Sequence, residues 1–227
     1  MENRVFNLII LDQSGSMRRI KSVALDGINE TLQTIRSEQK KHPGMQQIVS
    51  VLMFGGTDID MVRDCVKIDE VNDLYDTEYN PSGNTPLYDA IGRGITSVRE
   101  KVVAGDAVIV TIITDGEENS SSKYDHASVS RLISQYKEEG WLFSYIGANQ
   151  DSYRVARGLN IDNALNFKQD DEGVRGMFDK DRRARGRFMD MLISCMEREA
   201  PSHAIRNLVK DVDYFQEEEM DADSPDK

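Results

Sequence analysis

The fold of this 227-residue chain is decided by the stretch Asn7-Leu8-Ile9-Ile10-Leu11-Asp12-Gln13-Ser14-Gly15-Ser16-Met17. Residues 5 to 11 form an apolar run that is too short to cross a membrane and that stops at an acid, which indicates a strand buried on both faces. From Ile20 the apolar positions recur at helical spacing, until Pro43 and Gly44 end the pattern. This part of the chain predicts a strand, a loop with an acid and two hydroxyls, and a helix.

The alternation of strand and helix continues along the chain. Further strands are predicted at 47–54, 60–68, 107–114, 141–146 and 164–167, and further helices at 87–102, 129–140 and 152–158. The pair 47–54 and 60–68 is separated by Gly55-Gly56 and predicts a hairpin at one sheet edge. The pattern predicts an α/β fold with a doubly wound, mainly parallel central sheet, one antiparallel edge strand, and helices on both faces.

We expect one domain over residues 1–200 and a C-terminal appendage over 201–227. Residues 171–199 show a helical pattern that Pro201 ends. The apolar stripe over 205–212 predicts a short amphipathic helix, which could pack on its own domain or on another chain. The acidic residues that close the sequence predict a disordered tail.

The charge balance argues against some classes of partner. The chain has 28 basic and 40 acidic residues and a formal net charge of -12, which opposes binding to nucleic acid or to an anionic membrane surface. Its most concentrated cations alternate with Asp179 and Asp181 at helical spacing, so we expect them to form a solvated helix face. These cations are Lys180, Arg182, Arg183, Arg185 and Arg187.

Cysteine and histidine positions give no sign of a further site. Cys65 and Cys195 stand far apart without a CxxC neighbour, which argues against a zinc site built on them and against a disulfide framework. The three histidines show no ligand-like spacing, so we assign them no role. The sequence shows no basic signal-peptide region and no apolar run of about 20 residues, and we expect a cytoplasmic protein.

Five oxygen-bearing side chains follow the predicted strands in three separate segments: Asp12, Ser14, Ser16, Thr85 and Asp115. Ligands of open parallel sheets bind outside the carboxyl ends of the strands, where these segments should converge. Carboxylate and hydroxyl oxygens suit a hard divalent cation, and the absence of histidine and cysteine from the set argues against zinc or copper. Two acids would leave such a cation under-neutralised, with a coordination position open to an external carboxylate.

The three segments resemble the von Willebrand factor type A domain over roughly residues 4 to 170. The likeness rests on Asp12-Gln13-Ser14-Gly15-Ser16, on Thr85 within Gly83-Asn84-Thr85-Pro86-Leu87, and on Thr114-Asp115-Gly116. The resemblance implies a metal-ion-dependent adhesion site. In such a site the residues matching Ser14 and Ser16 coordinate the metal directly, and those matching Thr85, Asp12 and Asp115 do so directly or through water. The expected ion is Mg²⁺, with Ca²⁺ and Mn²⁺ left open.

The resemblance implies a binding module in which the cation accepts an Asp or Glu side chain from a partner protein. Intracellular relatives work beside AAA+ ATPases or kinases and phosphatases, although no residue here identifies such a partner. We expect no enzyme, because a phosphatase of the haloacid dehalogenase type needs a second Asp where Ser14 stands. The alternative to metal-dependent binding is a scaffold that binds through its C-terminal appendage, with a structural or vestigial metal site.

Residues near the expected rim have a simpler interpretation than partner selection. Asp89, Glu117 and Glu118 are expected to be solvated surface acids or acids of a first helical turn. Gly55-Gly56 is expected to be a turn rather than a phosphate-binding loop, because no helix start or lysine follows it.

Overall fold

Six strands form one sheet in the order β3-β2-β1-β4-β5-β6 in the computed structural model, which describes residues 3–148, 151–198 and 200–216. The strands are β1 (Asn3–Asp12), β2 (Met45–Gly55), β3 (Asp58–Lys67), β4 (Ala107–Thr114), β5 (Trp141–Gly147) and β6 (Asn163–Asn166). All neighbours are parallel except β3, which pairs antiparallel with β2 at the edge. The predicted fold class is confirmed.

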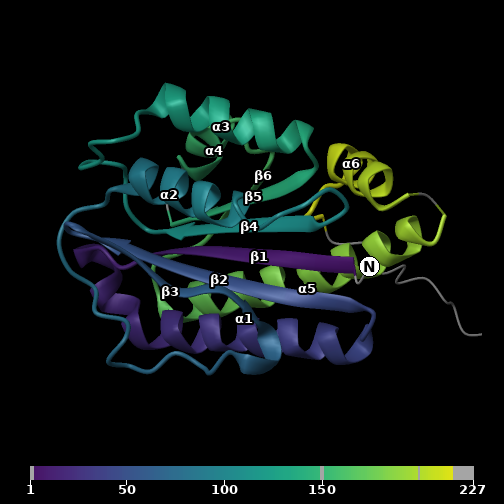
Figure 1. Cartoon of the computed structure of the whole chain (residues 1–227). Coiled ribbons are helices and arrows are strands. Elements are labelled where there is room, and N and C mark those ends of the chain that lie inside the picture. The colour runs from purple at the N-terminus through teal and green to yellow at the C-terminus, as the bar shows by residue number, and fades with distance from the viewer. Residues whose placement is uncertain (1–2, 149–150, 199, 217–227) are drawn as a thin grey trace, which may run out of the picture.

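Helices cover both faces of the sheet (Figure 1). One face carries α1 (Lys21–Lys41) and α5 (Asp171–Met196), and the other carries α2 (Leu87–Arg99) and α3 (His126–Glu138). Two further helices are α4 (Ser152–Gly158) and α6 (Pro201–Asp211), and two 3-10 turns are η1 (Gly15–Ile20) and η2 (Ile68–Glu70). Within the described residues, no helix has both the length and the apolar character needed to cross a membrane.

The central strands are apolar because both of their faces are covered. β4 is buried along its whole length, and β1 is buried from Val5 to Asp12. Alternate residues of β1 point to opposite faces: Ile9 and Leu11 pack with α1, whereas Leu8 and Ile10 pack with α2. Burial on both faces explains why these strands appear in the sequence as continuous apolar runs.

The C-terminal helix packs on the same domain as the rest of the chain. Ile205 of α6 and Tyr214 join an apolar cluster with Val5, Ile109 and Leu142, near the amino ends of β1, β4 and β5. The apolar stripe over 205–212 is therefore covered by its own domain. The boundary at residue 200 stays a prediction, and the acidic segment 217–227 lies outside the described residues.

Arg185 corrects the expectation of a solvated basic face on α5. Its side chain and that of Asp181 are each only 2% exposed. Arg185 donates to Asn7 Oδ1 at 2.8 Å, to Thr111 Oγ1 at 3.0 Å and to Asp181 Oδ2 at 3.4 Å. The hydroxyl of Tyr214 also donates to Asp181, at 3.3 Å. A buried charge pair and its polar neighbours thus connect α5 to the two central strands.

Replacing Arg185 should destabilise the fold strongly. Arg185→Ala leaves the carboxylate of Asp181 buried without its cation, which costs on the order of 3–5 kcal/mol of unfolding free energy. Arg182→Ala is the matched control, because Arg182 is about half exposed on the same helix and forms a surface ion pair with Asp179. It should change stability by less than about 0.5 kcal/mol. Urea unfolding followed by circular dichroism measures the unfolding free energy of each variant. An equal loss in the two variants would contradict this account of Arg185.

Candidate metal site at the sheet edge

The five predicted site residues meet at the edge of the sheet where the parallel strands end. β1 pairs with β4 up to Leu11 opposite Ile113, so the chain leaves both strands side by side. Asp12 is the last residue of β1, and Asp115 follows the last residue of β4. The central position of β1 thus brings the two acids to one edge, as predicted for an open parallel sheet.

Asp12 is held rigidly by two hydrogen bonds. Its Oδ1 accepts the backbone N–H of Ser14 at 2.6 Å, and its Oδ2 accepts the hydroxyl of Thr114 at 2.6 Å. The residue is fully buried, and its own carbonyl accepts the hydroxyl of Tyr79 at 2.8 Å. The carboxylate orientation is therefore fixed before any ligand arrives.

Ser14, Ser16 and Asp115 form a short hydrogen-bonded chain. The hydroxyl oxygens of Ser14 and Ser16 lie 3.0 Å apart, and the Ser16 hydroxyl donates to Asp115 Oδ1 at 2.6 Å. The other oxygen of Asp115 accepts from the side-chain amide of Gln169, which also donates to the carbonyl of Ser16 at 3.3 Å. Gln169 carries no sequence signal for this role.

Thr85 lies against the same group. A Cβ added at Gly116 would sit 2.8 Å from Thr85 Oγ1 and 3.5 Å from Asp12 Oδ2, so these two side chains share one small space. The backbone N–H of Thr85 donates to Asn119 Oδ1 at 2.8 Å, and the N–H of Asn119 donates back to the Thr85 carbonyl at 3.2 Å. All five predicted residues are thus brought together, and Asn119 positions one of them.

Backbone hydrogen bonds join the loops that carry these residues. Gly15 N–H donates to the carbonyl of Gly83 at 3.0 Å, and Ser82 N–H donates to the carbonyl of Gln13 at 2.7 Å. Gly83 has a positive φ of 71°, and a Cβ there would overlap Gly56. Only glycine permits both this backbone conformation and the close approach of the two loops.

The site carries two acids whose charges are not paired with a cation in the described part of the chain. Burial raises the pKa of Asp12 to about 6, the neighbouring charge of Asp115 adds to the shift, and burial also raises the pKa of Asp115. Among the described residues, no lysine or arginine forms a hydrogen bond or ion pair with either acid. A buried carboxylate without a counter-charge is costly. The donor set therefore fits a divalent cation, which would supply the missing charge.

The loop after Asp115 corrects the expectation for Glu118, whereas Asp89 lies in the first turn of α2, one of the two settings expected for it. Asp89 is buried and accepts the backbone N–H groups of Ser122, Lys123 and Tyr124, and these bonds lower its pKa against the opposing effect of burial. Glu118 accepts the N–H groups of Tyr88, Ser120 and Ser121. Both acids shape the site's rim instead of standing in solvent. Glu117 is exposed, as expected.

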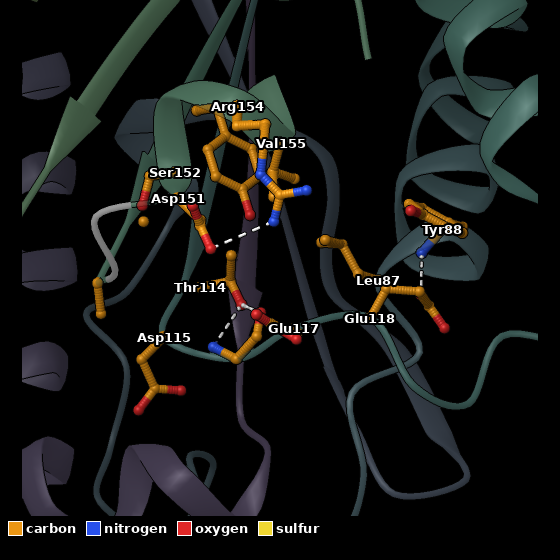
Figure 2. Close-up of a pocket in the computed structure, with 14 residues that line it drawn as sticks. Leu87, Tyr88, Thr114, Asp115, Glu117, Glu118, Asp151, Ser152, Arg154 and Val155 are labelled. Carbon is orange, nitrogen blue, oxygen red and sulfur yellow. Dashed lines mark hydrogen bonds and ion pairs between the residues drawn. The ribbon is translucent and has the colours of Figure 1, made fainter. Parts of the chain in front are cut away.

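A pocket of about 200 Å³ opens beside Asp115 (Figure 2). It lies between the start of α2, the ends of β4 and β5, and α4, and its lining includes Tyr88, Asp115, Glu117, Tyr145 and Arg154. Arg154 is exposed and pairs with Asp151 at 3.2 Å. The pocket thus adjoins the five oxygen-bearing residues through Asp115 and continues beyond them.

The fold is shared with solved structures at low sequence identity. No protein-family model and no curated protein matches the sequence. The vWF domain of the type V pili tip protein Mfa5 from Porphyromonas gingivalis superposes with a TM-score of 0.57 and 8% identity, covering 83% of this chain and 97% of that chain. The von Willebrand factor type A from Catenulispora acidiphila gives a TM-score of 0.55 and 15% identity, covering 79% and 42%.

The PilB minor pilin from Streptococcus sanguinis gives a TM-score of 0.56 and 12% identity over 81% of this chain. This chain spans 61% of that pilin's length. These likenesses show the fold alone: the chain has the fold of a von Willebrand factor type A domain.

Removing the charge of Asp12 should stabilise the metal-free protein near neutral pH. Because the folded-state pKa of Asp12 is about 6, above its ordinary value of 3.8, the folded state holds this proton more tightly than the unfolded chain. The contribution of this raised pKa to the unfolding free energy is fully present below about pH 4 and is lost as the pH rises through about 6. In chelator at pH 7, Asp12→Asn should therefore raise the unfolding free energy, by up to about 3 kcal/mol.

Urea unfolding at pH 4 and pH 7, in chelator and in Mg²⁺, checks this expectation. The rise in unfolding free energy caused by Asp12→Asn should vanish at pH 4. Added Mg²⁺ should stabilise the wild type more than the variant. The asparagine amide can donate to Thr114 Oγ1, whose hydrogen then turns to the carbonyl of Gly116 at 3.1 Å. A variant less stable than the wild type in chelator at pH 7 would show that the buried charge is not the dominant cost.

Proposed function

We propose that this chain is a protein-binding module whose edge site holds a divalent cation, with Mg²⁺ favoured over Ca²⁺ or Mn²⁺. Asp12, Ser14, Ser16, Thr85 and Asp115 would hold the ion. The cation would supply positive charge for a carboxylate of the partner protein. The observation that carries the proposal is the meeting of two buried acids and three hydroxyl side chains, with no described lysine or arginine bonded to either acid.

The surroundings support a partner larger than a small molecule. The acids sit at an open sheet edge, and the adjoining pocket has room for a side chain that neighbours the partner's carboxylate. One metal–carboxylate contact fixes where the partner sits on this chain, whereas affinity requires a surrounding interface of roughly 1,200 to 2,000 Å² in total. The partner we propose is therefore a folded protein or an ordered segment with an exposed Asp or Glu.

Binding is favoured over hydrolysis by the residue that follows Asp12 at two positions. A phosphatase with a carboxylate nucleophile needs an acid or base close by, and the residue at that position is Ser14, a poor proton carrier near neutral pH. We therefore infer a binding role and no catalytic residues.

The wider setting we propose is a cytoplasmic regulatory or assembly subunit, beside an AAA+ ATPase or a kinase and phosphatase system. Its free cysteines, Cys65 and Cys195, are compatible with a reducing compartment. The alternative, binding through the appendage, has less support because α6 packs into the core. Deleting residues 201–227 would strip Ile205 and Tyr214 from that core, so single substitutions at the metal site separate the two functions better.

Partner capture should require both the cation and the hydroxyl ligands. From native extract, wild type should retain a partner in Mg²⁺ and lose it in chelator, and Ser14→Ala with Ser16→Ala should lose it in Mg²⁺. The reason is that the variant keeps the acids and the fold but removes two metal ligands. Affinity purification with mass spectrometry measures the loss, expected to be about tenfold or more.

Ser37→Ala is the matched control, because Ser37 is an exposed serine on α1. It should capture the partner as the wild type does. A partner held equally well by the double variant in chelator would place the binding surface elsewhere.

A further inference from the structure

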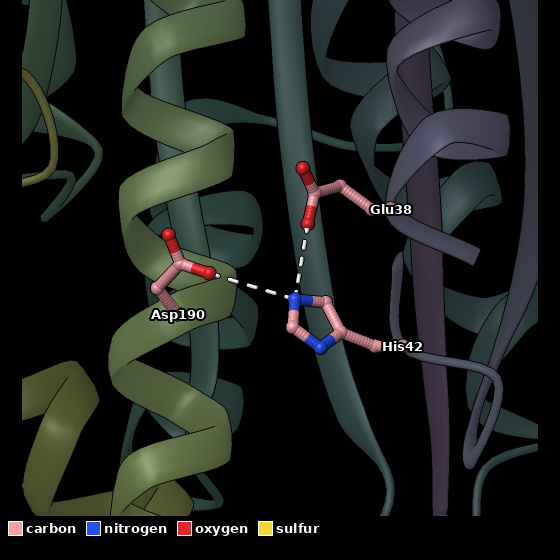
Figure 3. A group of neighbouring side chains, drawn as sticks. All are labelled: Glu38, His42 and Asp190. Carbon is pink, nitrogen blue, oxygen red and sulfur yellow. Dashed lines mark ion pairs between the residues drawn. The ribbon is translucent and has the colours of Figure 1, made fainter. Parts of the chain in front are cut away.

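A second group of potential metal ligands lies at the other end of α1. Glu38 and His42 stand one turn apart near its C-terminus, roughly 25 Å along the helix axis from its first residue. Asp190 approaches them from α5 (Figure 3). One ligand atom from each residue lies within 4.8 Å of the other two. The group is separate from the site at the carboxyl ends of the strands.

The spacing of these atoms suits an ion between them. His42 Nε2 lies 3.7 Å from Glu38 Oε2 and 3.5 Å from Asp190 Oδ1. Both separations are too long for a hydrogen bond. Ligand atoms of a tetrahedral zinc site, each about 2.0–2.1 Å from the metal, lie about 3.4 Å from one another. The two separations from His42 Nε2 are close to that value, and the ligand atoms of Glu38 and Asp190 lie within 4.8 Å of each other.

Two of the three ligand atoms are buried without a partner. Glu38 Oε2 and His42 Nε2 are each shielded from solvent, and neither forms a hydrogen bond. The whole Glu38 residue is only 9% exposed, and burial raises the pKa of its carboxyl group. Buried polar atoms are nearly always hydrogen-bonded, so two orphaned atoms that face each other require an explanation. A single ion would satisfy both.

We propose that Glu38, His42 and Asp190 bind a divalent transition-metal ion, Zn²⁺, that joins α1 to α5. An imidazole with two carboxylates is a ligand set that zinc accepts, unlike the all-oxygen set around Asp12, which suits Mg²⁺. Water would complete the coordination on the exposed side. Asp190 is 55% exposed there and bonds Lys41 at 2.6 Å, a contact that metal binding would replace. Because zinc would bind only the folded arrangement, it would also stabilise the fold.

Calorimetric titration of the full chain with ZnCl₂, in saturating Mg²⁺ to fill the site at Asp12, tests the proposal. The wild type should bind one equivalent. His42→Ala and Asp190→Asn should each weaken zinc binding by at least about tenfold. Even the loss of a residue that only hydrogen-bonds to a metal ligand lowers metal affinity by about that factor. Asp190 is exposed, so its replacement keeps the test valid if His42→Ala fails to fold. Co²⁺ should give the visible absorption of a tetrahedral site in wild type alone.

Two variants serve as controls. His203→Ala removes an exposed histidine from α6 and should leave zinc affinity unchanged. Ser14→Ala should also leave it unchanged, which separates this site from the proposed partner-binding site. The proposal is overturned if the wild type takes up no zinc in Mg²⁺, or if Asp190→Asn and a folded His42→Ala bind it as the wild type does. Either result would leave the three residues as an ion pair across the helices.

Discussion

The parallel pairing of β1 with β4 is the constraint on which the site depends. It places Ser16 and Asp115, 99 positions apart in the chain, within hydrogen-bonding distance. It also puts Thr114 beside Asp12, so that the hydroxyl of one strand orients the carboxylate of the other. Since both strands are covered on both faces, the acids at their ends are desolvated, and this is the main cause of their raised pKa values. One pairing therefore sets both the geometry and the electrostatics of the edge.

Most of the sheet could be predicted because buried strands and half-buried helices leave different apolar periods in the sequence. Arg185 could not be placed in the same way. Charges alternating along 179–187 do not reveal which side of α5 meets the sheet, and the solvated-face interpretation was wrong at this position. A signal did exist in the strands: Asn7 and Thr111 are polar residues inside apolar runs, and both accept hydrogen bonds from Arg185.

The candidate site was predictable only in part, for a related physical reason. Four of its five oxygen-bearing residues lie at the end of β1 or β4 or within a few residues of it, so the strand pairing fixes where they stand, and Thr85 lies just before the start of α2. Three further residues reach the site from irregular segments: Asn119, Tyr79 and Gln169. The course of these segments depends on tertiary hydrogen bonds that leave no periodic pattern in the sequence. Asp89 and Glu118 show the same limit, because their role is to accept backbone N–H groups of a loop without periodicity.

Helix α5 connects the regions that carry chemistry. Gln169, just before its first turn, contacts Asp115 at the edge site. Its middle is fixed by Arg185 to the central strands, and Asp190 faces Glu38 and His42 near its end. Between these points a Cβ at Gly27 of α1 would overlap the ring of Phe178, so only glycine allows the two helices to pack this closely. Because α5 is held along its length, its first turn has a fixed position relative to the sheet. The contacts of α1 with α5 therefore help to place Gln169 against Asp115.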